Sequence, residues 1–284
     1  MLRISVYTVL ALVSFAANSI LCRLALSGQA IDAASFTTVR LVSGAVTLYA
    51  LVSRRGRTSA PLPGSWRSAA MLALYAIPFS LAYVSLTIGT GALLLFGAVQ
   101  VTMLLTTIRR GERPGALQWI GATLALGGLV YLVLPGLTAP PLVPALLMLL
   151  AGVAWGVYSI LGRGSADPLG ETAGNFVRAV PFAVAASLVM LRDLHLESGG
   201  LFFAITSGAV ASGLGYVIWY AALRGLSSFT ASIVQLAGPV LAAAGGVLLL
   251  DERITTRLIL AGGLVLGGIA LAIVGRTRQA VVAS

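Results

Sequence analysis

The sequence contains no lysine, and only 9% of its 284 residues are charged. In soluble domains about a quarter of all residues are charged. Its mean hydropathy is +1.00. These values exclude an ordinary soluble protein and predict a membrane protein whose surroundings are the lipid bilayer. The net charge of +10 comes from arginine alone. We therefore interpret it as a topology signal, and we expect no nucleic-acid partner.

The sequence is also poor in residues that hold metals or perform catalysis. Its single cysteine, Cys22, excludes an internal disulfide, and its single histidine, His195, argues against a histidine metal site. An intramembrane hydrolase would need a Ser–His pair, paired acids or a metal cluster, and no G-x-S-x-G motif occurs. We therefore expect no enzyme activity, no catalytic residue, no metal and no cofactor.

Acidic residues are few, and all eight lie in loops or at the ends of apolar stretches: Asp32, Glu112, Asp167, Glu171, Asp193, Glu197, Asp251 and Glu252. Proton-coupled pumps and exporters of organic cations usually need an acid within the membrane. This absence disfavours a large cationic substrate. It favours a neutral or zwitterionic molecule with aromatic bulk, for which apolar burial and ring stacking supply binding energy.

Ten apolar stretches are long enough to be considered as membrane-spanning helices: 4–23, 33–53, 68–87, 91–108, 115–134, 142–162, 172–191, 200–222, 227–249 and 256–275. The expected class is an all-α membrane protein with ten transmembrane helices. Ser14, Phe15 and Ala16 resemble a signal-peptide cleavage site. We interpret this stretch as the first span instead, because its Ser19 and Arg23 recur in mid-chain.

The recurrence extends along the chain at a constant offset of 140 residues. Ser19 and Arg23 match Ser159 and Arg163. Glu112, Arg113, Gly127 and Gly128 match Glu252, Arg253, Gly267 and Gly268. The Pro-rich stretch 134–144 separates the copies, which predicts two five-helix repeats, 1–138 and 139–284. Because five is odd, the second repeat must cross the membrane upside down, as in many secondary transporters.

The arginines predict the orientation. With the N-terminus inside, twelve arginines are cytoplasmic and four are external, so we expect both termini in the cytoplasm of a bacterial-type inner membrane. The cytoplasmic set is Arg3, Arg54, Arg55, Arg57, Arg67, Arg109, Arg110, Arg113, Arg163, Arg224, Arg276 and Arg278, and the external set is Arg23, Arg192, Arg253 and Arg257.

Two motifs now identify a family resemblance. Each repeat has an acid–Arg turn before a Gly-rich last helix, "GERPGALQWIGATLALGG" and "DERITTRLILAGGLVLGG", and an arginine early in its second span, "TTVRLV" and "NFVRAV". The sequence thus resembles the EamA-type exporters of the drug/metabolite transporter superfamily, and most closely the YddG-type exporters of aromatic amino acids. Pro239 fits a proline that is common in this family, but Val99 stands at the equivalent place of the first repeat.

The first span of each repeat supplies candidate substrate-binding residues. Phe15, Asn18 and Ser19 are spaced i, i+3 and i+4, so they share one helix face. The equivalent residues of the second repeat, 140 positions later, are Trp155, Tyr158 and Ser159. Further candidates are aromatic or uncharged polar residues of other spans: Phe79, Tyr83, Phe96, Gln100, Tyr216, Ser232 and Gln235. Glutamine facing lipid is costly, so Gln100 and Gln235 should point inward. Helix–helix packing is the alternative for all of these residues.

Arg40 and Arg178 lie inside predicted helices. Snorkelling or binding to backbone carbonyls is the favoured interpretation, and capture of a substrate carboxylate is the alternative. Trp219 and Tyr220 are assigned to an interfacial aromatic belt, and the glycine pairs Gly127-Gly128, Gly262-Gly263 and Gly267-Gly268 to close helix packing.

The resemblance implies export of amino acids, aromatic ones first, by alternating access in a monomer or homodimer. A carrier of another neutral metabolite, such as a sugar derivative or a nucleoside-like compound, remains an alternative. So does a structural or lipid-scrambling protein.

Overall fold

The computed structural model describes residues 2–55, 62–109, 115–136, 139–162, 165–223, 226 and 234–282. Over this part of the chain every named element is a helix. The described residues form no strand beyond an isolated antiparallel bridge between Ile31 and Leu196. The predicted all-helical class is therefore confirmed for them.

A helix overlaps each of the ten predicted spans. Those of the first half are α1 (Leu2–Ser27), α2 (Ala33–Ser53), α3 (Trp66–Tyr83), α4 (Ile88–Arg109) and α5 (Ala116–Val133). The second half contains α6 (Leu142–Leu161), α7 (Pro168–Val189), the short η1 (Leu191–Asp193), a continuous segment made of α8 (Ser198–Thr206), η2 (Ser207–Leu214) and α9 (Gly215–Leu223), then α11 (Ala237–Leu250) and α12 (Thr256–Val282).

By length and composition, seven helices of the described chain are able to cross a membrane. They are Arg3–Ser27, Ala33–Ser53, Ala116–Val133, Leu142–Leu161, Pro168–Val189, Ser198–Trp219 and Thr256–Gly275. Two further apolar helices, Ile88–Met103 and Ala237–Leu250, are shorter.

Several helices begin where the sequence offers a capping side chain. Asp32 accepts a hydrogen bond from the amide of Ser35 at the start of α2, and Ser65 accepts one from Ser68 at the start of α3. Asp167 caps α7, which begins with Pro168. These side chains satisfy amides that have no partner within the helix, and proline in the first turn removes an amide that the helix does not use.

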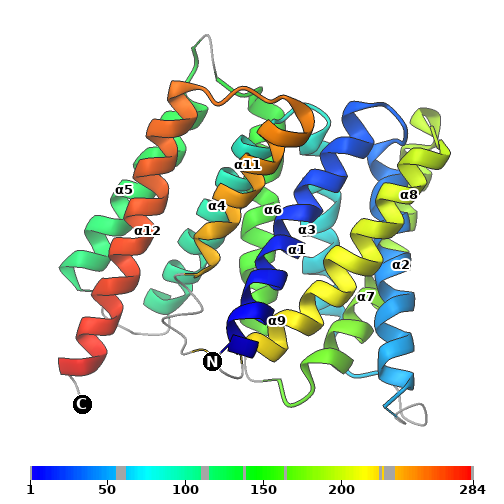
Figure 1. The fold of residues 1–284 in the computed structure, drawn as a ribbon, viewed down its shortest axis with the longest axis horizontal. Helices are drawn as coiled ribbons and strands as arrows, with labels where there is room; N and C mark the ends of the chain where they lie inside the picture. Colours follow the sequence, from blue (N-terminus) through cyan, green and yellow to red (C-terminus); the bar gives the residue numbers. More distant parts are fainter. Residues whose placement is uncertain are drawn as a thin grey trace.

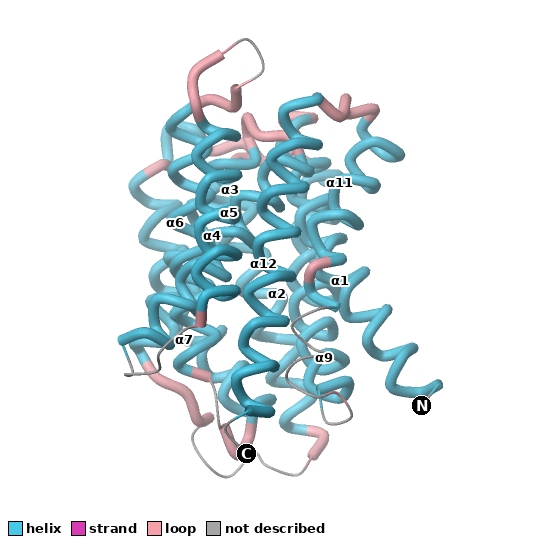
Figure 2. Tube along the Cα trace, turned by 90° about the vertical axis from the view of Figure 1, so that its left-hand side faces the viewer, coloured by secondary structure: helices cyan, strands magenta, loops and turns pink. Residues whose placement is uncertain are grey.

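The helices pack as a bundle with both termini at one end (Figures 1 and 2). α2 contacts α7, α4 contacts α11, and α3 contacts α6. α5 and α12 form a closely packed pair at one edge (Figure 1). A Cβ atom on Gly121 would lie 2.4 Å from the carbonyl oxygen of Gly268, and one on Gly268 would lie 2.5 Å from that of Gly121. Only glycine therefore permits this contact between backbones.

The close-packing role predicted for the glycine pairs is right for Gly128 and Gly268, which meet the opposite helix. It is wrong for the others, because no atom of another described helix lies within 4 Å of the Cβ position at Gly127, Gly262, Gly263 and Gly267. The error arises because adjacent residues in a helix point in directions about 100° apart, so one contact face accommodates only one member of a pair.

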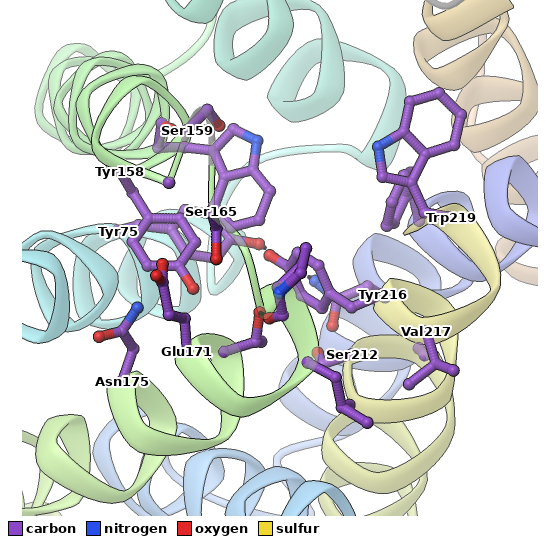
Figure 3. Close-up of a pocket in the computed structure, with 18 of the residues that line it drawn as sticks. Tyr75, Tyr158, Ser159, Ser165, Glu171, Asn175, Ser212, Tyr216, Val217 and Trp219 are labelled. Atoms are coloured by element: carbon purple, nitrogen blue, oxygen red, sulfur yellow. Dashed lines mark hydrogen bonds between the residues drawn. The ribbon is translucent and has the colours of Figure 1, made fainter. Parts of the chain in front are cut away.

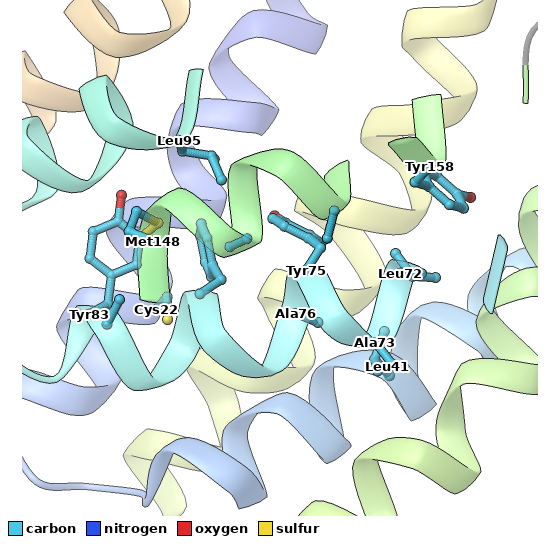
Figure 4. Packing of buried hydrophobic residues seen from close by; sticks show 14 of the residues in the cluster. Cys22, Leu41, Leu72, Ala73, Tyr75, Ala76, Tyr83, Leu95, Met148 and Tyr158 are labelled. Carbon is cyan, nitrogen blue, oxygen red and sulfur yellow. The ribbon is translucent and has the colours of Figure 1, made fainter. Parts of the chain in front are cut away.

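The main hydrophobic core lies where α1, α2, α3 and α6 meet. Figure 4 shows Tyr83, Cys22 and Met148 toward one end of this cluster and Tyr158 at the other. Tyr83, Cys22 and Met148 have no exposed surface. This packing forms the rigid wall behind the cavity described below.

The segment from α8 to α9 contains a π-helical stretch, η2, of eight residues, Ser207–Leu214. It packs against α2, where a Cβ atom on Gly208 would lie 2.1 Å from the carbonyl oxygen of Arg40. Long π-helical stretches are rare and are frequent at functional sites. Here the stretch brings the backbone of η2 against the turn of α2 that carries Arg40.

The end of the bundle opposite the termini is held together by Glu252, in the turn between α11 and α12. Its Oε2 accepts a hydrogen bond of 2.7 Å from the amide of Ile88, at the start of α4. Its Oε1 lies 3.6 Å from Nε of Arg23, near the end of α1. Nη1 of Arg23 in turn donates to the carbonyls of Tyr83 and Val84, at the end of α3. One ion pair thus joins the ends of four helices.

Candidate functional site

A cavity of about 820 Å³ lies between the two halves of the chain. Its lining comes from α1, α2, α3, α4, α6, α7, η2 and α9 (Figure 3). It extends from Arg40 and Phe79 in the middle of the bundle to Arg55 and Asp167, at the end of α2 and the start of α7. This is the end at which both termini lie (Figure 1).

Aromatic side chains dominate the wall of the cavity. Eight line it: Phe15, Tyr75, Phe79, Phe96, Trp155, Tyr158, Tyr216 and Trp219. Trp155 is central among them, with ring centroids 4.8 Å from Tyr75, 5.4 Å from Tyr158 and 5.5 Å from Tyr216. The ring of Trp155 stacks on that of Tyr158 and is tilted toward the other two. Such a wall suits a flat apolar group, because offset and edge contacts between rings stabilise it.

A network of polar side chains forms the deep end. The hydroxyl of Tyr75 accepts hydrogen bonds from Nδ2 of Asn18 at 3.2 Å and from Nη2 of Arg40 at 3.0 Å. Oδ1 of Asn18 accepts one from Ser207 at 2.6 Å. Nε of Arg40 donates a longer hydrogen bond to Ser212, at 3.4 Å. The network therefore connects α1, α2, α3 and η2 across the bundle.

The two helix arginines have different environments. Arg178 donates to the backbone carbonyls of Leu62 and Pro63, as the favoured interpretation predicts. Arg40 is only 3% exposed and lies over the rings of Tyr75 and Phe79, at 5.3 Å and 5.1 Å from their centroids. Its guanidinium neither snorkels nor binds a carbonyl in the described part of the chain. The favoured interpretation is therefore wrong for Arg40.

The predicted substrate-binding residues largely come together. The cavity is lined by Phe15, Asn18, Ser19, Phe79, Phe96, Gln100, Trp155, Tyr158, Ser159, Tyr216 and Gln235. Tyr83 does not line it, because its fully buried hydroxyl donates to the carbonyl of Ile88 at 3.4 Å. Ser232 lies outside the described residues. Contact with a substrate remains a prediction for all of them.

Some lining residues also have structural partners. The hydroxyl of Ser159 donates to the carbonyl of Trp155 one helical turn earlier, at 2.8 Å. Both ends of the Asn18 amide take part in the deep network. Asn18 thus contacts other helices, as the packing alternative predicts, and also lines the cavity, whereas the hydrogen bond of Ser159 stays within its own helix.

Other residues line the cavity but were not among the expected substrate-binding residues, including Tyr75, Trp219, Ser212 and Asn175. Trp219 is 8% exposed and its ring lies 5.9 Å from that of Phe15, so the aromatic-belt assignment is wrong. Tyr75 lies one turn from Phe79 on the same helix face, and that spacing alone could have included it. The side chain of Tyr220 is outside the described residues.

Charge in the cavity is distributed unevenly. Arg40 lies at the deep end, whereas Arg55, Asp167 and Glu171 line the mouth. Two acids, Asp167 and Glu171, thus reach the cavity from the end of a span, which is the position expected from the sequence. No group of acids, cysteines and histidines suited to a metal ion occurs among the residues that the structure describes.

Comparison with known proteins places this geometry in context. Residues 142–274 match the model of the EamA-like transporter family. An uncharacterized protein of Pseudomonas aeruginosa is 56% identical over 273 residues, which cover 96% of this chain and 95% of that protein. A solved crystal structure shares the fold with a TM-score of 0.63 and 19% identity, covering 93% of this chain and 96% of that one. Residues 142–274 of the chain are thus similar to the EamA-like transporter family, and its apolar helices fit a multi-pass membrane protein.

Proposed function

We propose that this protein exports amino acids, aromatic ones first, across a bacterial inner membrane by alternating access. The aromatic cavity is the observation that carries the proposal. Its volume of about 820 Å³ lies within the range of small-molecule sites. Eight aromatic residues surround it, while amide and hydroxyl groups of Asn18, Gln100 and Ser212 supply polar contacts.

Two inverted five-helix repeats, 1–138 and 139–284, are part of the proposal, because they would allow alternating access. Several of the helix contacts occur in the pairs that such a symmetry would produce. α3 packs on α6 as the α8–α9 segment packs on α1, and α4 packs on α6 as α11 packs on α1. The equivalent helices α2 and α7, α4 and α11, and α5 and α12 also contact one another. Inverted repeats characteristically rock around a site near the middle of the membrane.

The orientation proposed from the arginines makes the open end of the cavity cytoplasmic. Arg55 and both termini lie at that end, and the Arg23–Glu252 pair lies at the opposite one. An exporter must load its substrate from the cytoplasm, so this conformation is the loading state in our proposal.

Counterflow in proteoliposomes tests the function directly. Vesicles preloaded with unlabelled phenylalanine or tryptophan should accumulate the labelled amino acid transiently, with saturation. Uptake of labelled sugars and nucleosides by the same vesicles tests the alternative, a carrier of another neutral metabolite. Failure of every aromatic amino acid to exchange would refute the proposal, and lipid movement without saturable exchange would favour a scrambling protein.

A further inference from the structure

The guanidinium of Arg40 has one nitrogen that donates no hydrogen bond to any other described residue. Nη2 donates to the hydroxyl of Tyr75 and Nε to that of Ser212. Nη1 is buried and has no hydrogen-bond partner among the described residues. Buried polar atoms nearly always have partners, so an exception in a cavity indicates a group that binds there.

The charge of Arg40 is also uncompensated. No ion pair of the described residues includes it, although it is 3% exposed. An arginine side chain keeps its positive charge in proteins, and a buried charge is costly unless it is paired. Arg178 provides the contrast, because its Nη1 and Nη2 both have carbonyl partners outside the cavity. We therefore expect Arg40 to have a binding role that Arg178 does not share.

The surroundings of Arg40 restrict what its partner can be. Tyr75 and Phe79 lie against the guanidinium as cation–π partners, at 5.3 Å and 5.1 Å. Further ligands must therefore approach through the N–H groups that remain in its plane. A carboxylate accepts hydrogen bonds in this geometry and supplies the missing negative charge. The same two rings are part of the aromatic wall, so a carboxylate bound here would place an attached aromatic group against that wall.

We propose that Arg40 is the residue that binds the carboxylate of the substrate. This inference deepens the proposed transport of amino acids and relies on the same cavity. The cavity then selects molecules with a carboxylate close to an aromatic group, and it discriminates against their amides and decarboxylated amines. Arg40 acts as a specificity determinant of the deep end, with Tyr75 and Ser212 holding its guanidinium in place.

Equilibrium binding to the purified full chain tests the inference without requiring transport. Phenylacetate and phenylacetamide are matched probes that differ in charge but hardly in shape, and quenching of Trp155 and Trp219 fluorescence reports their binding. The wild type should prefer phenylacetate by roughly tenfold or more, because a hydrogen-bonded charge is lost with the amide. Arg40→Gln should abolish this preference, and the control Arg178→Gln should keep it.

Arg40→Lys covers the case in which Arg40→Gln does not fold. Lysine retains the charge but lacks the planar guanidinium, which can donate two hydrogen bonds to one carboxylate. The substitution should therefore lower the affinity for phenylacetate and leave the affinity for phenylacetamide unchanged. Equal binding of both probes by the wild type, absence of phenylacetate binding, or a preference that survives in Arg40→Gln would overturn the inference. So would an equal loss for both probes in Arg40→Lys. Carboxylate preference without counterflow of aromatic amino acids would refute the proposed function and leave Arg40 as an anion-binding residue.

Discussion

Replacing Trp155 by alanine should weaken the transport of tryptophan and phenylalanine about tenfold or more. The Trp155 ring already contacts Tyr75, Tyr158 and Tyr216, so a substrate ring can add only one further aromatic pair. Such a pair contributes about 0.5–1.5 kcal/mol beyond its buried area. Loss of about 40 Å² of apolar contact adds about 1 kcal/mol. The sum, about 1.5–2.5 kcal/mol, corresponds to roughly ten- to seventyfold in affinity.

Counterflow of labelled tryptophan and of labelled alanine, measured with wild type and Trp155→Ala, separates binding from packing. The substitution should raise the half-saturating concentration of tryptophan and spare alanine, if alanine is carried. Trp155→Phe should lie between the two. Trp119, which is 52% exposed on α5, gives a matched control in Trp119→Ala. Thermal unfolding must show that the variants fold alike. An equal loss for every substrate would refute the binding role and favour packing, and unchanged transport would remove Trp155 from the site.

Three further predictions concern the membrane topology and the end of the bundle opposite the termini. Burial raises the pKa of Glu252 above its ordinary value of 4.5, against the opposing effects of the Ile88 amide and Arg23. The folded state then holds the proton more tightly than the unfolded chain, so this contribution to stability is present at low pH and is lost as pH rises through the raised pKa. The difference in Tm between wild type and Glu252→Gln should therefore shift in favour of wild type from pH 8 to pH 5, and a constant difference would contradict the assignment. Gly246→Ala would place a Cβ atom 2.5 Å from Oε2 of Glu252, so hydrogen exchange of the Ile88 amide should accelerate; unchanged protection would show that the carboxylate accommodates the methyl group. A reporter fused after Ser284 should give a cytoplasmic signal, and a periplasmic signal would disprove the orientation.

The positions of the helices and the faces that line the cavity were predictable, because long apolar stretches mark spans and helical spacing marks faces. Phe15, Asn18 and Ser19 thus lie together in the cavity with Trp155 and Tyr158.

Contacts between helices were harder to predict. Whether Arg40 reaches carbonyls, as Arg178 does, depends on which helix lies opposite it. Trp219 lies about one turn before the end of the α8–α9 segment, where an interfacial position and a cavity position give the same sequence pattern. The π-helical stretch was not predicted either, because no local motif distinguishes it from an α-helix.

That stretch also has a mechanical consequence. Ser207, at its first turn, is bound to Asn18 of the deep network, whereas Tyr216 and Trp219 follow its last turn. A π-helical turn holds one residue more than an α-helical turn needs, and one residue corresponds to about 100° of rotation about the axis. Each conversion of a π turn to an α turn would therefore rotate the two rings while Ser207 stays fixed. Such a conversion would change the direction in which Tyr216 and Trp219 face the cavity that both residues line.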